Sequence, residues 1–210
     1  ISWGNLLTEP QTKADKESGV LSKTCIAELV KIYNLVKYGR KKDITTKQMD
    51  KGILAEEDSI TLLCRVDKKM YFKNQERLEN EWFTGHPDVF SGKSIFEADT
   101  VDDMKNSHLL SNFTDKTVET VTPAQKCQLN VYYDLTNALG GNIVHALMSL
   151  PSEMFQKECD KLLWRMANNG EIATEYSPLY LEAVEGLKKK FIYDHIPESE
   201  RIFIQPVPKD

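Results

Sequence analysis

The N-terminal part of the chain changes from a polar stretch to two helical patterns. Residues 1–20 are polar and lack periodicity, so we expect an extended arm there. Apolar side chains recur every three to four positions over residues 22–39, which predicts a helix ending at Gly39, a residue suited to a left-handed C-cap. A second helix is predicted from residue 46 to about residue 64. The predicted apolar positions are Ile26, Leu29, Val30, Tyr33 and Val36 in the first helix and Ile53, Ile60, Leu63 and Cys64 in the second.

Short apolar runs separated by turn-forming residues predict strands in the centre of the chain. Gly85, Pro87 and the Ser91-Gly92 pair separate these runs. The predicted strands are residues 70–72, 82–89, 94–103 and 104–105. This pattern is typical of a β-meander.

The C-terminal half contains the clearest helix start. Thr122 can act as N-cap, Pro123 takes the first helical position and Gln125 completes a capping box. We expect Gly140 and Gly141 to end this helix. The later predicted elements are a strand at 142–150, helices at 152–166 (capped by Ser152) and 178–190, and an edge strand at 202–207. The order predicts a single mixed α/β domain over residues 1–210, with a core at about 22–150 and C-terminal helices and an edge strand at 151–210.

Composition supports a folded domain and excludes several classes of protein. The chain has 210 residues, of which 40% are hydrophobic and 28% charged. No apolar run approaches the roughly 18 residues of a membrane helix and no secretory signal pattern is visible, so we expect no membrane association and a cytoplasmic location. The chain opens at Ile1, which leaves open whether this N-terminus is native. Four cysteines without metal-ligand spacing are expected to be buried thiols: Cys25, Cys64, Cys127 and Cys159.

The acidic net charge disfavours a nucleic-acid partner. Lys and Arg total 27 against 32 Asp and Glu, a net charge of −5, whereas a nucleic-acid-binding domain is usually basic. Basic residues nevertheless concentrate between residues 37 and 51. The balance therefore permits a confined basic surface that leads to an acidic pocket.

The candidate catalytic residues lie on the central predicted strands. Asp103 and Lys105 occupy alternate positions, so they project from one face of a strand while Met104 points away. With Asp88 on a neighbouring strand, two carboxylates and a main-chain carbonyl would form an oxygen-rich site suited to Mg²⁺ or Mn²⁺. The alternative is that Asp88 is only a turn residue after Pro87 and that Asp103 and Lys105 form a surface ion pair.

Two helical pairs extend this site. Glu56, four positions after Gly52, lies at the border of the predicted apolar face, but Glu57 lies nearly as close on the other flank. Periodicity alone does not choose between these two carboxylates. Gln128 and Tyr132 share a helix face through their i, i+4 spacing, and an exposed Gln beside a core Tyr would have the same spacing.

The four motifs occur together in the order of a known family. They are G-x-x-x-E at residues 52–56, G-x-P-D at 85–88, D-x-K at 103–105 and Q-x-x-x-Y at 128–132. Over roughly residues 22–133 the sequence resembles the PD-(D/E)xK nuclease superfamily, and within it the phage YqaJ-like viral recombinase and lambda-exonuclease-like family. The resemblance implies a restriction-endonuclease-like core, a central mixed β-sheet flanked by helices, and favours Glu56 over Glu57.

The resemblance further implies a metal-dependent exonuclease that hydrolyses phosphodiester bonds of linear duplex DNA from the 5′ end. One or two Mg²⁺ or Mn²⁺ ions per site would be held by Asp88, Asp103 and the Met104 carbonyl, with Glu56 at the second ion. Lys105 would position the nucleophilic water, and Gln128 and Tyr132 would orient the site and the substrate backbone.

Contacts with DNA and protein partners are also implied. Ser22 could bind the terminal phosphate, or act as a plain N-cap. Arg40, Lys41 and Lys42 could track DNA phosphates, or simply lie in water. The implied partners are duplex DNA ends, a single-strand annealing protein and further copies of the chain, as a trimer ring by analogy, in phage-type recombination in the bacterial cytoplasm.

Two departures from the family pattern and two other functions stay open. Asp102 precedes the D-x-K motif where an apolar residue is usual, so it is either an exposed edge position or a surplus ligand. His86 stands where a small polar residue is usual. The alternative functions are an endonuclease of the same fold, a Cas4-like nuclease of different polarity, and an inactive DNA-binding protein of the same fold. The scattered cysteines disfavour the Cas4-like nuclease.

Overall fold

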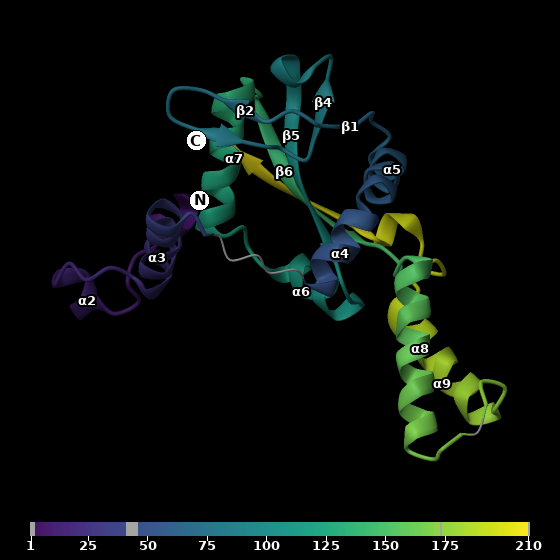
Figure 1. The fold of residues 1–210 in the computed structure, drawn as a ribbon. Helices are drawn as coiled ribbons and strands as arrows, with labels where there is room; N and C mark the ends of the chain where they lie inside the picture. The colour runs from purple at the N-terminus through teal and green to yellow at the C-terminus, as the bar shows by residue number, and fades with distance from the viewer. Residues whose placement is uncertain (1–2, 41–45, 173, 210) are drawn as a thin grey trace.

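The computed structural model describes residues 3–40, 46–172 and 174–209. Its centre is a five-stranded mixed sheet with the order β1-β4-β5-β6-β7 (Figure 1). Only the β5–β6 pair is parallel in this sheet, and the other neighbours are antiparallel. The strands are β1 (Phe72–Lys73), β4 (Val89–Gly92), β5 (Ala98–Ser107), β6 (Gly140–Leu147) and β7 (Ile202–Pro208). The predicted mixed sheet flanked by helices is confirmed.

Helices cover both faces of this sheet. On one face, α7 (Pro123–Thr136) packs Leu129 and Tyr133 against Val101 of β5. On the other, α5 (Glu56–Asp67) packs Leu63 against Met104. The parallel β5–β6 connection holds α6 (Leu110–Val118) and α7, as a parallel pair requires a long crossover. The sequence pattern had not indicated α6.

The N-terminal prediction is half right. The first predicted helix is α3 (Lys23–Tyr38), with Ser22 as N-cap and Gly39 left-handed at the C-cap. Instead of an extended arm, α1 (Trp3–Leu6) and α2 (Lys13–Glu17) precede it, because the Thr12 side chain caps the start of α2 and α1 packs against α3 and α7. The apolar positions predicted for α3 lie at its surface.

The second predicted helix is broken at Ala55 into α4 (Lys47–Leu54) and α5. The reason is that α4 buries Lys51 and not Ile53, whose side chain is 71% exposed. Lys51 donates hydrogen bonds from Nζ to the carbonyl oxygens of Ser107 at 3.0 Å, His108 at 3.2 Å and Met148 at 2.5 Å. Three main-chain acceptors thus hold α4 across the ends of β5 and β6.

The central and C-terminal elements differ from prediction mainly at their boundaries. Residues 98–107 form one strand, where two had been predicted at 94–105, and η1 (Ile95–Glu97) precedes it. A separate hairpin pairs β2 (Leu78–Glu79) with β3 (Thr84–Gly85). Asn137, in the left-handed conformation, ends α7 before Gly140 is reached. The Thr122 capping box is confirmed.

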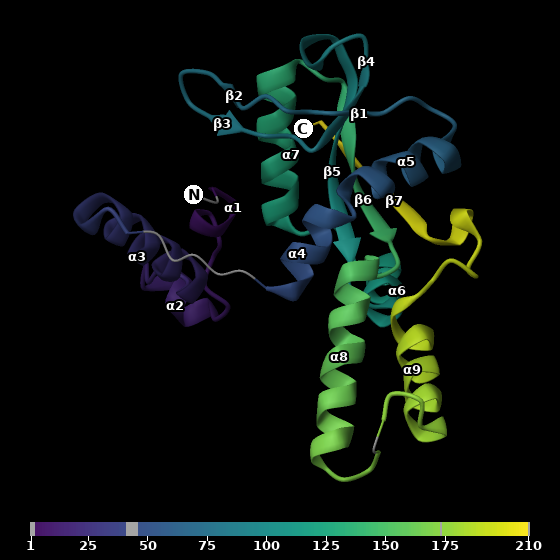
Figure 2. The same ribbon diagram turned by 45° about the vertical axis from the view of Figure 1, so that its right-hand side comes forward.

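The C-terminal helices form a hairpin that projects from the body of the molecule (Figure 2). They are α8 (Ser152–Asn168) and α9 (Pro178–Phe191), joined through their own apolar cluster that includes Leu162 and Tyr180. Pro151 is the N-cap of α8, so the predicted cap at Ser152 is wrong. A short turn, η2 (Glu198–Glu200), leads to the predicted edge strand β7. Cys25 and Cys159 are buried free thiols, while Cys64 and Cys127 are only half-buried.

Candidate active site

Asp88 and Met104 connect two neighbouring strands at the centre of the sheet. Asp88 directly precedes β4, and its Oδ2 accepts a hydrogen bond from the Met104 main-chain N–H at 2.8 Å. Burial and the neighbouring Asp103 carboxylate raise the pKa of Asp88 to about 7, against the opposing effects of this hydrogen bond and of Lys105. Asp88 is thus more than a turn residue, because its carboxylate is tied to the strand that carries the D-x-K motif.

Asp103 and Lys105 project from one face of β5, as strand alternation predicts. Asp103 is 2% exposed, and its Oδ2 lies 2.7 Å from Lys105 Nζ. The carboxylate of this ion pair is therefore buried, while the Lys105 side chain is 42% exposed. The partner of this buried oxygen is the Lys105 ammonium, so a metal ion bound there would have to share the carboxylate with that lysine.

The Gln128–Tyr132 pair flanks the acidic residues from α7. Gln128 Nε2 donates to Tyr132 Oη at 2.8 Å, which agrees with the predicted shared face. Burial raises the pKa of Tyr132 to about 12, and the charges of Asp103 and Asp88 add to this effect. Gly85 makes room for the ring, because a Cβ at this glycine would lie 2.9 Å from Tyr132 Cε1.

The structure separates the two candidate helix carboxylates. Glu56 begins α5, and its Oε2 lies 2.9 Å from Lys73 Nζ, whereas Glu57 Oε1 lies 3.8 Å from the same nitrogen. The Glu56 side chain is 28% exposed and that of Glu57 is 84% exposed. Lys73 pairs with Val89, the residue after Asp88. Val89 in turn pairs with Asp102, so the Glu56–Lys73 ion pair lies on the Asp102 face of the sheet. Sequence reasoning missed Lys73 because no motif contains it.

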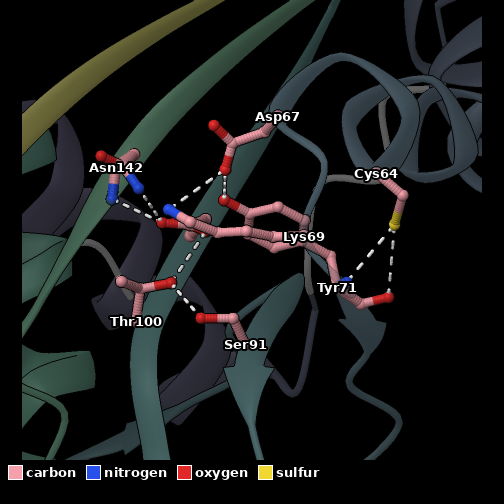
Figure 3. Close-up of polar contacts among 8 residues, drawn as sticks. Cys64, Asp67, Lys69, Tyr71, Ser91, Thr100 and Asn142 are labelled. Atoms are coloured by element: carbon pink, nitrogen blue, oxygen red, sulfur yellow. Dashed lines mark hydrogen bonds and ion pairs between the residues drawn. The ribbon is translucent and has the colours of Figure 1, made fainter.

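Asp102 faces away from the acidic pair. It is fully buried, so its interpretation as an exposed edge residue is wrong. Its Oδ1 accepts hydrogen bonds from the main-chain N–H and the side-chain Nδ2 of Asn142, both at 2.7 Å. Figure 3 shows Asn142 and Thr100 in the polar cluster on this side of the sheet, with Tyr71, Asp67 and Lys69 close by. This carboxylate is therefore engaged by protein donors.

The predicted DNA-contacting residues lie in the N-terminal part. Ser22 is buried, and its Oγ accepts from Cys25 N at 3.0 Å and lies 2.6 Å from Thr8 Oγ1, which is the geometry of an N-cap. Arg40 is exposed just after α3, and Lys41 and Lys42 lie outside the described residues. His86 is exposed.

The donors present fit one divalent cation. Asp88, Asp103 and the Met104 carbonyl supply the hard oxygen ligands that Mg²⁺ and Mn²⁺ prefer. Across residues 3–40, 46–172 and 174–209, no group of three or more His, Cys, Asp or Glu side chains is gathered for a metal. Glu56, expected at a second ion, is paired with Lys73.

The fold defines the class of protein: the chain shares its fold with solved exonucleases. A phage-related exonuclease from Haemophilus somnus 129PT superimposes with a TM-score of 0.62 at 23% identity, over 98% of this chain and 81% of that one. An alkaline exonuclease from Laribacter hongkongensis gives a TM-score of 0.55 at 9% identity, over 90% of this chain and 71% of that one. A structure of the same enzyme in complex with dAMP gives the same TM-score at 10% identity. No protein-family model and no curated protein sequence matches the chain.

Proposed function

We propose that the chain is a metal-dependent deoxyribonuclease that degrades linear duplex DNA from its ends, with 5′ to 3′ polarity, in phage-type recombination. The observation that carries this proposal is the convergence of Asp88, Asp103 and Lys105 in a lambda-exonuclease-like fold. The exonucleases with this fold support DNA as the substrate. Polarity and the recombination role rest on the resemblance of the motifs.

In the proposed reaction, one water oxygen bonds to phosphorus while the bond from phosphorus to the 3′-oxygen breaks. The water proton passes to solvent and the leaving 3′-oxygen takes up a proton. Asp88, Asp103 and the Met104 carbonyl would hold Mg²⁺ or Mn²⁺, which when bound stabilises the charge on the phosphate oxygens and acidifies water. Lys105, beside Asp103, would hold the attacking water. Tyr132, held by Gln128, would orient the substrate backbone.

The test compares wild type with two site variants on end-labelled duplex, with and without a 5′ phosphate. We expect degradation in Mg²⁺, none in EDTA, and a loss of at least about 100-fold in Asp103→Asn and Lys105→Ala. Asp99→Asn is the matched control, because Asp99 is an exposed carboxylate on the same strand. Wild type that never degrades DNA would refute the enzyme and leave a DNA-binding protein. Cleavage of closed circles would indicate an endonuclease instead.

We also propose that the chain associates with copies of itself and with a single-strand annealing protein. Support for self-association comes from α3, where apolar side chains form an exposed stripe. Val30 and Tyr33 are each 52% exposed and Val36 is 81% exposed. A contiguous apolar surface of this kind more often marks a protein–protein contact than a surface left exposed to solvent. The trimer ring and the annealing partner rest on the resemblance.

The proposed partners are soluble nucleic-acid and protein molecules in the cytoplasm. In the described ranges, no helix has the length and apolarity needed to cross a bilayer. Arg40, exposed at the end of α3, would contact DNA phosphates together with Lys41 and Lys42. Ser22 would reach the terminal phosphate only if its capping bonds were given up.

A further inference from the structure

The parallel strands β5 and β6 come unusually close just before the candidate catalytic residues. The register pairs Thr100 with Gly140, and the same offset continues from Asp103 and Ile143 to Ser107 and Leu147. Between these points, a Cβ at Gly141 would lie 1.8 Å from the Val101 carbonyl oxygen, so this position requires glycine. The two backbones are therefore in close contact immediately before Asp103.

The Asp102 carboxylate accepts a main-chain hydrogen bond where the two strands come close. Asn142 donates its main-chain N–H to Asp102 Oδ1 at 2.7 Å, and its side-chain Nδ2 donates to the same oxygen at 2.7 Å. A side-chain acceptor on β5 thus serves an N–H of β6. Because an N–H without an acceptor is costly inside a protein, the close approach of these strands depends on this carboxylate.

The contacts of Asp102 extend to a third strand. Thr100 Oγ1 lies 3.4 Å from Asp102 Oδ2 and 2.8 Å from Ser91 Oγ on β4. Figure 3 shows Ser91, Thr100 and Asn142 on their three strands. The carboxylate therefore joins β4, β5 and β6 on the face opposite Asp103. Burying a carboxylate is costly even with Lys69 nearby to favour its charge, and the hydrogen bonds that link Asp102 to three strands point to a role in geometry.

We propose that Asp102 is a positioning residue that fixes the path of β5 and thereby places Asp103 and Met104 for metal binding. Successive residues of a strand point to opposite faces, so anchoring Asp102 on one face sets the direction of Asp103 on the other. The next N–H, that of Met104, holds Asp88. The expected effect on catalysis rests on the proposed nuclease function. The effect on the path of β5 can be measured without nuclease activity.

The first test uses Asp102→Leu and Asp102→Asn in the full chain. Leucine removes the acceptor, whereas asparagine keeps one acceptor oxygen at the same place. For Asp102→Leu we expect kcat to fall by about 10- to 100-fold, the range found for residues that support metal ligands, with little change in KM for DNA. Asp102→Asn should keep most of the activity. Asp99→Leu, at an exposed position near the start of the same strand, should behave as wild type.

The second test measures amide hydrogen exchange at Met104 by NMR in metal-free protein. In Asp102→Leu, the Met104 N–H, which donates to Asp88, should exchange at least about 10-fold faster than in Asp99→Leu. Asn142→Ala removes only the side-chain hydrogen bond to Asp102 and keeps the main-chain one, so Met104 exchange should increase to an intermediate degree. This variant replaces Asp102→Leu in the test if Asp102→Leu does not fold. Wild-type exchange in both variants would overturn the positioning role. Absence of wild-type nuclease activity would instead overturn the proposed function and leave this exchange test valid.

Discussion

At the scale of single residues, the acidic pair governs how the metal-free protein responds to pH. The pKa of Asp88 is raised to about 7 by burial and by Asp103, above the ordinary value of 3.8. A group whose pKa is raised on folding adds stability while it is protonated, and this contribution is lost as the pH rises through the folded value. Folding of the metal-free site is therefore favoured at acidic pH.

This gives a prediction for stability in EDTA. Wild type should lose free energy of unfolding between about pH 5 and pH 8, and Asp88→Asn should lose less because residue 88 no longer titrates. Denaturant unfolding at both pH values measures the difference, with Asp99→Asn as control. Mg²⁺ at the higher pH should restore wild-type stability. An identical pH dependence in wild type and Asp88→Asn would contradict the prediction.

Sequence reasoning succeeded at those site residues whose relation is local. Asp103 and Lys105 follow strand alternation, and Gln128 and Tyr132 follow helix spacing, so each pair was predictable from a few positions. Lys73 and the Asp102–Asn142 pair depend on which strands lie side by side and in what register. Such information is not contained in a local pattern, which is why the sequence left open whether Asp102 is an exposed edge position or a surplus ligand.

At the scale of elements, Lys51 explains the break between α4 and α5. The sequence predicts one helix because Ile53 continues the apolar period, but the three carbonyl acceptors at the ends of β5 and β6 favour burial of the lysine. A pattern of apolar residues cannot reveal acceptors that come from distant segments. The predicted helix boundaries were otherwise close, since Ser22, Gly39 and the Thr122 capping box act locally.

We predict that Lys51→Met destabilises the protein by about 1–3 kcal/mol, because the removed ammonium leaves buried carbonyl oxygens without a donor. Gln48→Met on the exposed side of the same helix should change stability little. Chemical denaturation followed by circular dichroism measures both. Equal stability of the two variants would show that the three hydrogen bonds do not hold α4.

The exposed stripe on α3 carries a second prediction at this scale. Val30→Asp places a charge in the stripe and should lower the mass of the assembly, as measured by light scattering. Ala27→Asp lies on the same helix but outside the stripe, so it should leave the assembly intact. A wild-type monomer, or an unchanged assembly in Val30→Asp, would refute self-association through α3.

At the scale of the whole molecule, the position of the acidic residues matters more than the net charge of −5. Asp88 and Asp103 gather at the candidate site, where phosphate would be repelled without a cation. We predict that duplex ends bind weakly in EDTA and at least about 10-fold more tightly in Ca²⁺, a cation of the same charge and oxygen preference as Mg²⁺. Fluorescence anisotropy measures both affinities at one salt concentration, and Asp103→Asn should reduce the difference. Equal affinity with and without the cation would exclude the metal as a bridge to DNA.

The place of β6 in the sheet has a consequence for biosynthesis. This strand supports β5 on one edge, and β7, formed by residues 202–208, covers its other edge. Tyr133 on α7 donates its hydroxyl hydrogen bond to the Val207 carbonyl at 2.6 Å, which ties the helix beside the acidic pair to the same late segment. On the ribosome, the sheet stays open until these residues emerge. The candidate site therefore gains this support only after β7 has been made, later than the strands and the helix that carry Asp88, Asp103 and Tyr132.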